Sequence, residues 1–154
     1  MGVLYIYCCW VFRRYLHIVD DSTLFQFNTY QGMKKTRIDY FGNYMIIEDC
    51  NSIYRVNYQE LHYIIHQKPY TVIYTNQGKE LYIFYPIKNL IKYLPFVFAQ
   101  CNKSTIINMI HFKVFEKKQN KSIIVLESGI SFVISKRRIN DVKNKIKLNH
   151  CFPI

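Results

Sequence analysis

Polar side chains interrupt an otherwise apolar stretch of the chain, LPFVFAQCNKSTIINM, at residues 94–109. Gln100, Asn102, Lys103 and Ser104 bring amides, an ammonium and a hydroxyl together between two apolar runs. These groups can form hydrogen bonds with phosphates and with the edges of nucleic-acid bases. They can equally satisfy the backbone at two strand ends, and for Asn102 and Ser104 both interpretations stay open.

A second group with binding chemistry is the basic run Lys136, Arg137 and Arg138, which joins a strand-like segment to a helix-like one. A helix start already carries a partial positive charge, so each exposed cation there costs about 0.3–1 kcal/mol. Free backbone N–H groups with three cations suit a phosphate, and a guanidinium can also reach guanine O6 and N7. The alternative is a solvated basic turn.

The composition indicates a polyanionic partner. Lys and Arg number 21 against 10 acids in 154 residues, which gives a net charge of +11 and a pI near 9.4. This excess favours nucleic acid ahead of a membrane surface, although basic residues can also keep an apolar surface soluble. The length predicts one folded domain with a possible appendage.

Residues suited to catalysis or metal binding are few. The chain has no G-x-S-x-G, P-loop or G-x-G-x-x-G motif. His62 and His66 have the i, i+4 spacing of helical metal ligands, but their segment is strand-like. Five cysteines form no C-x-x-C pair and leave one odd, which fits a reducing cytoplasm. We therefore expect a cytoplasmic protein that is not an enzyme and has no metal site and no cofactor.

The elements that position these polar groups are mostly short strands. β-branched and aromatic residues between turn signals predict strands, and apolar residues at helical spacing predict helices over 86–94 and 138–147. The strand-like segments are 45–48, 52–56, 61–65, 70–75, 80–85, 96–101, 105–108, 110–116, 121–127 and 130–135. The sequence therefore predicts a mainly β fold with two short helices.

Residues 1–40 are predicted to form an N-terminal appendage. Their apolar run is stopped by Arg13 and Arg14 and is too short to span a bilayer. It could pack as an extra strand or helix, contact a protein or a membrane surface through residues 3–19, or precede the true start at Met33. We expect the folded domain to cover residues 41–148, with a C-terminal tail at 149–154.

The order of these segments resembles a LytTR-type DNA-binding domain, the effector domain of bacterial response-regulator-like proteins. Members typically have an Arg-containing strand, a His-Asn-Ser-Phe type turn that leads into Ile-Val-Asn, and later a Ser-Arg-Arg turn. The matching residues here are Gln100, residues 102–108 and residues 135–138, and the resemblance covers roughly residues 44–146. It implies an elongated β-sandwich-like fold whose loops enter successive major grooves of DNA.

The resemblance also implies which residues contact DNA. The candidates fall in three turns: Lys68 and Tyr70, then Asn102, Lys103 and Ser104, then Lys136, Arg137 and Arg138. Gln100 replaces the usual Arg, Asn102 replaces His, and Pro69 stands beside the first turn. Because the loss of an arginine removes a charge and a bidentate donor, affinity or base preference can differ from that of relatives.

We expect a stand-alone, sequence-specific transcriptional regulator that binds double-stranded DNA, with two copies on direct-repeat sites as a homodimer. The alternative is a non-enzymatic, β-rich interaction module that binds a protein or an anionic membrane surface. A basic and aromatic face built around Tyr5, Trp10, Arg13 and Arg14 would favour that alternative.

Overall fold

The computed structural model describes residues 36–49 and 52–151. The predictions for residues 3–19, for Met33 and for residues 152–154 of the tail therefore lie outside the described residues. Within the described ranges, no helix is long and apolar enough to cross a membrane.

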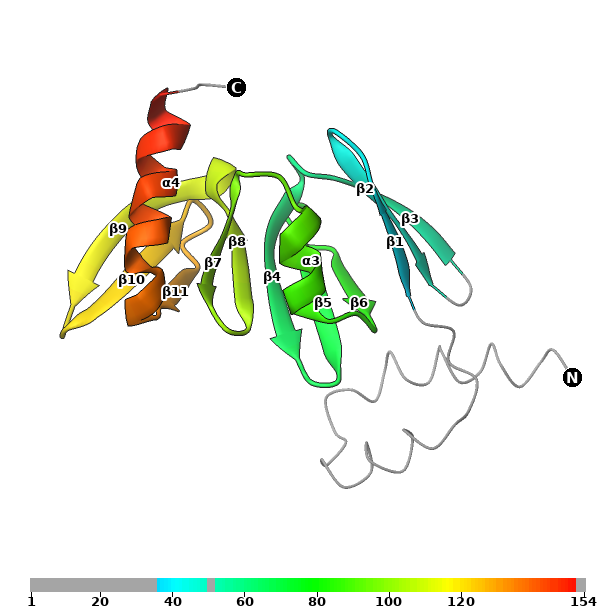
Figure 1. The fold of residues 1–154 in the computed structure, drawn as a ribbon, viewed down its shortest axis with the longest axis horizontal. Helices are drawn as coiled ribbons and strands as arrows, with labels where there is room; N and C mark the ends of the chain where they lie inside the picture. Colours follow the sequence, from blue (N-terminus) through cyan, green and yellow to red (C-terminus); the bar gives the residue numbers. More distant parts are fainter. Residues whose placement is uncertain (1–35, 50–51, 152–154) are drawn as a thin grey trace, which may run out of the picture. The chain divides into compact units, whose positions relative to one another are not determined.

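These residues form three antiparallel sheets, which we name the N-terminal, central and C-terminal sheets (Figure 1). The N-terminal sheet has the order β1-β2-β3, with β1 (Arg37–Tyr40), β2 (Tyr44–Asp49) and β3 (Ser52–Asn57). The central sheet has the order β6-β5-β4-β8-β7, with β4 (Leu61–Gln67), β5 (Tyr70–Thr75), β6 (Glu80–Ile83), β7 (Phe98–Asn102) and β8 (Thr105–Asn108). The C-terminal sheet has the order β11-β10-β9, with β9 (Phe112–Lys118), β10 (Lys121–Leu126) and β11 (Ser131–Ile134).

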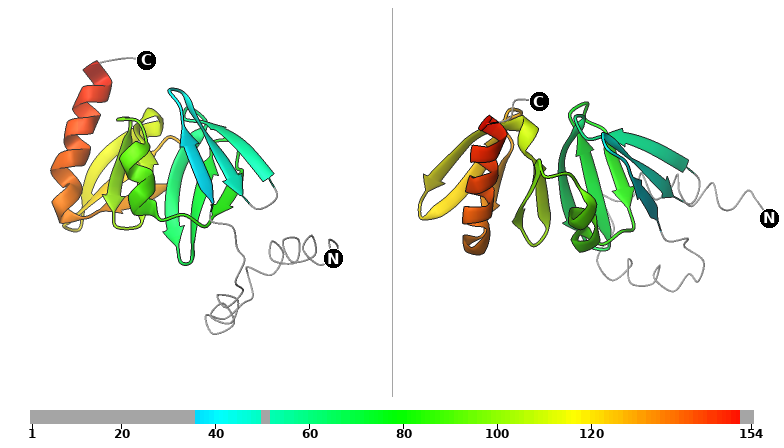
Figure 2. Two further views of the ribbon diagram at one scale, coloured as in Figure 1. Left: turned by 45° about the vertical axis from the view of Figure 1, so that its right-hand side comes forward. Right: turned by 45° about the horizontal axis from the view of Figure 1, so that its top comes forward.

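Short helical segments connect and cover these sheets. Helix α3 (Ile87–Tyr93) follows β6, and the 3-10 turn η1 (Met109–His111) joins β8 to β9. The 3-10 turn η2 (Lys136–Arg138) leads from β11 into helix α4 (Ile139–Cys151). Figure 2 shows the central sheet between the other two sheets in both views.

Strands β7 and β8 of the central sheet are buried on both faces, and their sequence explains why. Successive residues of a strand point to opposite faces, so the apolar runs in β7 and β8 supply both faces with apolar side chains. Phe98 and Ile106 belong to one core, whereas Ala99, Cys101 and Ile107 belong to the other. The sheet therefore holds two cores in one folded unit.

The first core joins the central sheet to the N-terminal sheet and α3. Met45 and Ile47 of β2 pack with Ile64 of β4 and Leu90 of α3, and all four side chains are fully buried. Burial of an apolar side chain of this size contributes about 1.5–3 kcal/mol.

The second core joins the central sheet to the C-terminal sheet and α4. Ile124 and Ile134 of the C-terminal sheet pack with Ile107 of β8 and Val142 of α4. Lys145 Nζ of α4 donates a hydrogen bond to the carbonyl oxygen of Phe98 at 2.6 Å. An outer strand exposes unpaired backbone groups, so α4 protects the edge of β7.

The structure confirms the mainly β fold with two short helices, and each of the ten strand-like segments corresponds to an observed strand. The sequence pattern missed β1 (Arg37–Tyr40). This strand has only four residues, so its alternation of polar and apolar side chains is too short to stand out in the sequence. Its Ile38 side chain is buried in the first core, so the folded unit includes residues that precede position 41.

Candidate nucleic-acid interface

The predicted contact residues come from turns that share one end of the central and C-terminal sheets. The two-residue turn Lys68–Pro69, whose peptide bond is cis, joins β4 to β5. Next to it, the His66 N–H donates to the Ser104 carbonyl at 2.8 Å, and the Ser135 N–H donates to the Cys101 carbonyl at 2.9 Å. These bonds place the β4–β5 turn, the β7–β8 turn and the start of η2 in a row, and Figure 1 shows the two β-turns at the lower ends of their strands.

The β4–β5 turn carries one exposed cation next to well-packed residues of β5. Lys68 is exposed, whereas Tyr70 is half-buried and its ring meets Phe84 edge-on with 6.2 Å between the ring centroids. The buried Thr71 hydroxyl donates to the Tyr85 carbonyl at 2.6 Å. Packing and this bond fix the strand that follows Lys68.

The β7–β8 turn is held by its own side chains. Asn102 Oδ1 accepts hydrogen bonds from the Ser104 N–H at 2.9 Å and from the Ser104 hydroxyl at 3.1 Å, and Asn102 Nδ2 donates to the Val133 carbonyl at 3.3 Å. Asn102 and Ser104 thus satisfy the strand ends, which is one of the two interpretations that the sequence leaves open. Lys103, between them, is exposed.

Arg138 has an internal partner that the sequence did not predict. Its Nη2 donates to Gln100 Oε1 at 2.6 Å, and Gln100 is only 9% exposed. Sequence reasoning noted Gln100 only as a departure from the family pattern, because no local signal links it to a residue 38 positions away. The arginine that ends η2 therefore ties the basic turn to the edge of β7.

Lys136 and Arg137 are the exposed members of the basic turn. The turn forms one 3-10 segment before α4, and the Ser135 hydroxyl donates to the Cys101 carbonyl at 3.3 Å instead of capping the helix. Asp141 lies in the first turn of α4 and offsets part of the unfavourable charge that three cations place near a helix start. Lys136 and Arg137 thus remain available for an external anion.

Asn108, the last residue of β8, has a structural role. Its side chain is fully buried and donates to the carbonyls of Tyr58 at 2.8 Å and Leu61 at 2.7 Å. Its Oδ1 accepts the Ile110 N–H at 3.1 Å. The residue therefore holds the start of β4 against the end of β8.

The two histidines with helical spacing lie on β4 and serve different contacts. The His62 ring lies edge-on to His111 with 4.8 Å between the ring centroids, and His66 Nδ1 lies 3.1 Å from Thr71 Oγ1. Burial lowers the pKa of His62, His111 lowers it further, and Glu127 opposes both. Within residues 36–49 and 52–151, no group of three or more His, Cys, Asp or Glu side chains is arranged to hold a metal ion.

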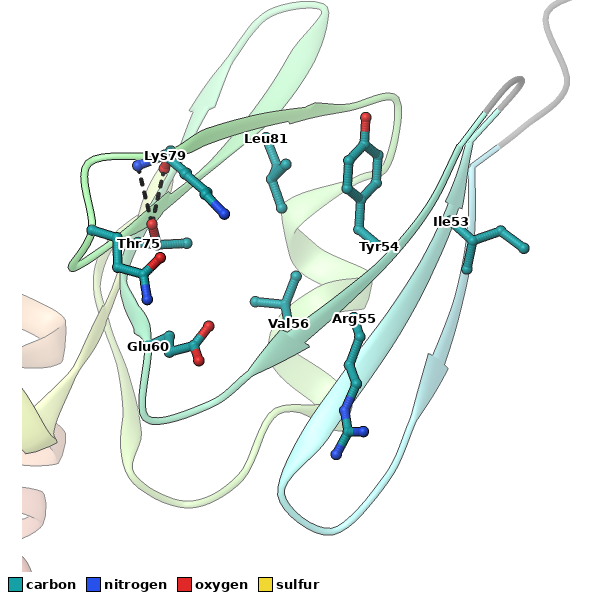
Figure 3. Close-up of a pocket in the computed structure, with 9 residues that line it drawn as sticks. Ile53, Tyr54, Arg55, Val56, Glu60, Thr75, Lys79 and Leu81 are labelled. Carbon is teal, nitrogen blue, oxygen red and sulfur yellow. Dashed lines mark hydrogen bonds between the residues drawn. The ribbon is translucent and has the colours of Figure 1, made fainter.

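A pocket of about 220 Å³ lies between β3 and the β5–β6 hairpin (Figure 3). Its polar groups serve local structure, since Asn57 donates to Glu60 at 2.9 Å and the Lys79 N–H donates to Thr75 Oγ1 at 3.1 Å. The lining residues are Ile53, Tyr54, Arg55, Val56, Glu60, Thr75, Gln77, Lys79 and Leu81. They include a single carboxylate and neither cysteine nor histidine, so the lining holds neither a pair of carboxylates nor a Cys–His pair for catalysis.

We name the exposed cations of the three turns, Lys68, Lys103, Lys136 and Arg137, the cationic edge. Three acids, Glu60, Glu80 and Glu127, lie at the opposite ends of the strands in these two sheets, together with the exposed cations Lys79 and Lys113. This separation of charge makes the cationic edge the more attractive end for a polyanion.

Comparison with known proteins identifies the kind of polyanion. The sequence model of the LytTr DNA-binding domain matches residues 51–147, which include all of the predicted contact residues. The chain belongs to this family. The LytTR fold is also similar to a solved LytTr DNA-binding domain from Bacillus cereus, with a TM-score of 0.59 and 14% sequence identity over 69% of this chain and 98% of that domain. No curated protein sequence gives a significant match.

Membership confirms the resemblance that the sequence motifs indicate. The LytTR family consists of DNA-binding domains of the kind found in transcriptional regulators, and it is not a family of enzymes. The partner of this chain is therefore DNA, a polyanion that matches the chain's excess of positive charge.

Proposed function

We propose that this LytTR protein is a sequence-specific transcriptional regulator whose cationic edge lies along duplex DNA, with its turns entering successive major grooves. One observation carries the proposal: four exposed cations from three separate turns share one end of contiguous strands. Hydrogen bonds fix the backbone of these turns before any ligand binds, so less conformational entropy is lost on binding.

The side chains of the cationic edge suit two kinds of contact. Arg137 can form paired hydrogen bonds with guanine O6 and N7, and it is our candidate for base recognition. Lys68, Lys103 and Lys136 are compact point charges that suit phosphates. These lysines set affinity and position, whereas Arg137 sets sequence preference.

The other predicted residues support the cationic edge. Arg138 holds the basic turn through Gln100, and Asn102 and Ser104 hold the turn that carries Lys103. Tyr70 anchors the first turn against Phe84, and its position next to that turn keeps it a contact candidate. Substitution of Arg138, Asn102 or Ser104 would change DNA affinity by moving the neighbouring cations of the cationic edge.

Two copies on direct-repeat sites, acting as a homodimer in the cytoplasm, complete the proposal. A single small module buries only about 600–1,000 Å² on DNA, which limits its affinity. A second copy on an adjacent site raises the effective affinity without new contacts within either copy.

Site selection from a random duplex pool with the full chain tests this function. The winning duplex and a scrambled duplex are then titrated at several salt concentrations. We expect enrichment of a repeated motif and a higher affinity for it than for the scrambled duplex. Arg137→Ala should weaken binding to the motif by about 1–3 kcal/mol, while Lys136→Ala should weaken both duplexes alike and reduce the salt slope by about one.

Lys79→Ala is the matched control, because Lys79 is exposed at the opposite end of the central sheet. Equal losses on both duplexes for Arg137→Ala would remove its base-reading role. The absence of any enriched motif, with weak binding that disappears near physiological salt, would favour the interaction module that binds a protein or membrane surface.

A further inference from the structure

The β9–β10 hairpin carries a group of cations outside the three turns described above. Its two-residue turn, Gln119–Asn120, has φ values of 47° and 63°, and positive φ at both positions is typical of a tight type I′ turn. Lys118 and Lys121 flank this turn and face each other directly across the ladder. The hairpin therefore fixes both lysines close to its tip.

We name Lys117, Lys118 and Lys121 the lysine tip; all three are exposed. Glu116 is the adjacent acid, and it accepts a hydrogen bond from Lys118 Nζ at 2.8 Å. Like charges that face each other on neighbouring strands destabilise a hairpin, so this arrangement loses stability unless an anion compensates it. A surface ion pair with one half-buried acid compensates little for the repulsion between Lys118 and Lys121.

The pairing of β10 places the lysine tip beside the basic turn. Ser122 of β10 pairs with Ile134 of β11, so the start of β10 lies next to the end of β11. The chain leaves β11 at Ser135 and enters η2 immediately afterwards. The tip thus continues the row formed by the three turns, and Figure 1 shows the end of β9 at the same lower side as the start of α4.

We propose that the lysine tip binds phosphates of the same DNA duplex, beyond the position contacted by Arg137. This inference rests on the proposed function and extends it by a fourth contact region. Lysine ammonium groups suit phosphates as point charges but lack the fixed fork that reads a base pair. The contact therefore adds affinity and salt dependence without changing the preferred sequence.

The test uses the full-length double variant Lys117→Gln/Lys121→Gln, which removes two charges and keeps the Lys118–Glu116 contact. Lys79→Gln/Lys113→Gln removes the same charge at the opposite strand ends and is the matched control. Lys117→Arg/Lys121→Arg keeps the charge at the tip. Binding to the selected duplex and to a scrambled duplex is measured across salt concentrations, and thermal melting confirms that each variant is folded.

We expect the Gln variant at the tip to bind both duplexes about tenfold more weakly and to lower the salt slope by about 1–2, since each released phosphate contact contributes roughly 0.9. The control and the Arg variant should both bind like the wild type. An unchanged slope for the tip variant, while the wild type binds and Arg137→Ala fails, would overturn the lysine-tip contact and leave the proposed function standing. A wild-type chain that binds no duplex would overturn both.

Discussion

The Arg138 guanidinium donates a hydrogen bond to the Gln100 side-chain oxygen at 2.6 Å, across 38 positions of sequence. Gln100 is buried in β7, and Arg138 ends η2. This contact joins the basic turn to the central sheet and so sets where the adjacent Arg137 is presented. Two neighbouring arginines thus have different tasks, one inside the fold and one at the cationic edge.

Arg138→Met should lower the free energy of unfolding by about 1–3 kcal/mol, because Gln100 Oε1 loses a charged donor in a buried position. Arg137→Met is the matched control, and at an exposed position it should change stability by less than about 0.5 kcal/mol. Urea unfolding followed by circular dichroism measures both. Equal stability of the two variants would show that the Arg138–Gln100 bond does not hold the turn.

The strands were predictable because their local signals agree with the fold. β-branched and aromatic runs between turn residues mark almost every strand, and Pro86 and Pro95 flank the segment that forms α3. β1 was missed because its stability comes from pairing with β2 and from burial of Ile38, which are tertiary effects. The family motifs then indicated which fold these strands form.

The chemistry of the turns was less predictable than their location. The sequence places Asn102, Ser104 and Arg138 in the contact turns, but it does not show which polar groups are already satisfied inside the protein. That depends on partners such as Val133 and Gln100, which only the folded chain brings near. Long-range hydrogen bonds therefore decide which residues of a polar turn remain for DNA.

Asn108→Ala should lower the free energy of unfolding by about 2–4 kcal/mol. It leaves the buried carbonyls of Tyr58 and Leu61 without their donor, and buried unsatisfied groups are costly. The control is Asn76→Ala at an exposed turn, with an expected change below about 0.5 kcal/mol. Chemical unfolding measures both; a small loss for Asn108→Ala would mean that water replaces the missing amide.

Asn102→Asp should separate stability from DNA binding. A carboxylate still accepts from the Ser104 N–H and hydroxyl, and at the exposed 3.3 Å contact with the Val133 carbonyl an acceptor oxygen replaces the donor. The melting temperature should stay within a few degrees of the wild type, while the new negative charge beside Lys103 weakens DNA binding about tenfold. Melting curves and titrations at one salt concentration test this pair of outcomes, and unchanged DNA affinity would place the β7–β8 turn away from the phosphates.

The folded protein should also lose stability as the pH falls, because of His62. Its side chain is only 7% exposed, and burial lowers its pKa, with a further decrease from His111 and an opposing effect of Glu127. The unfolded chain protonates this histidine near its ordinary pKa of about 6.5, whereas the folded chain protonates it at lower pH. Between these values the unfolded state binds more protons, so the stability contributed by His62 is full above about pH 6.5, decreases as the pH falls toward the folded pKa, and stays constant below it.

His62→Gln should reduce this dependence, because glutamine does not titrate. His66→Gln is the matched control on the same strand, where His66 Nδ1 contacts Thr71 Oγ1 at 3.1 Å. Urea unfolding at several values between pH 5 and pH 7.5 gives the slope for each variant, with the range set by the ordinary histidine pKa of about 6.5. We expect a shallower slope for His62→Gln than for the wild type and the control. A slope equal to that of the wild type would assign the acid sensitivity to a group other than His62. Because His62 lies at the start of β4, at the opposite end from the turn that carries Lys68, this test of stability leaves the cationic edge unchanged.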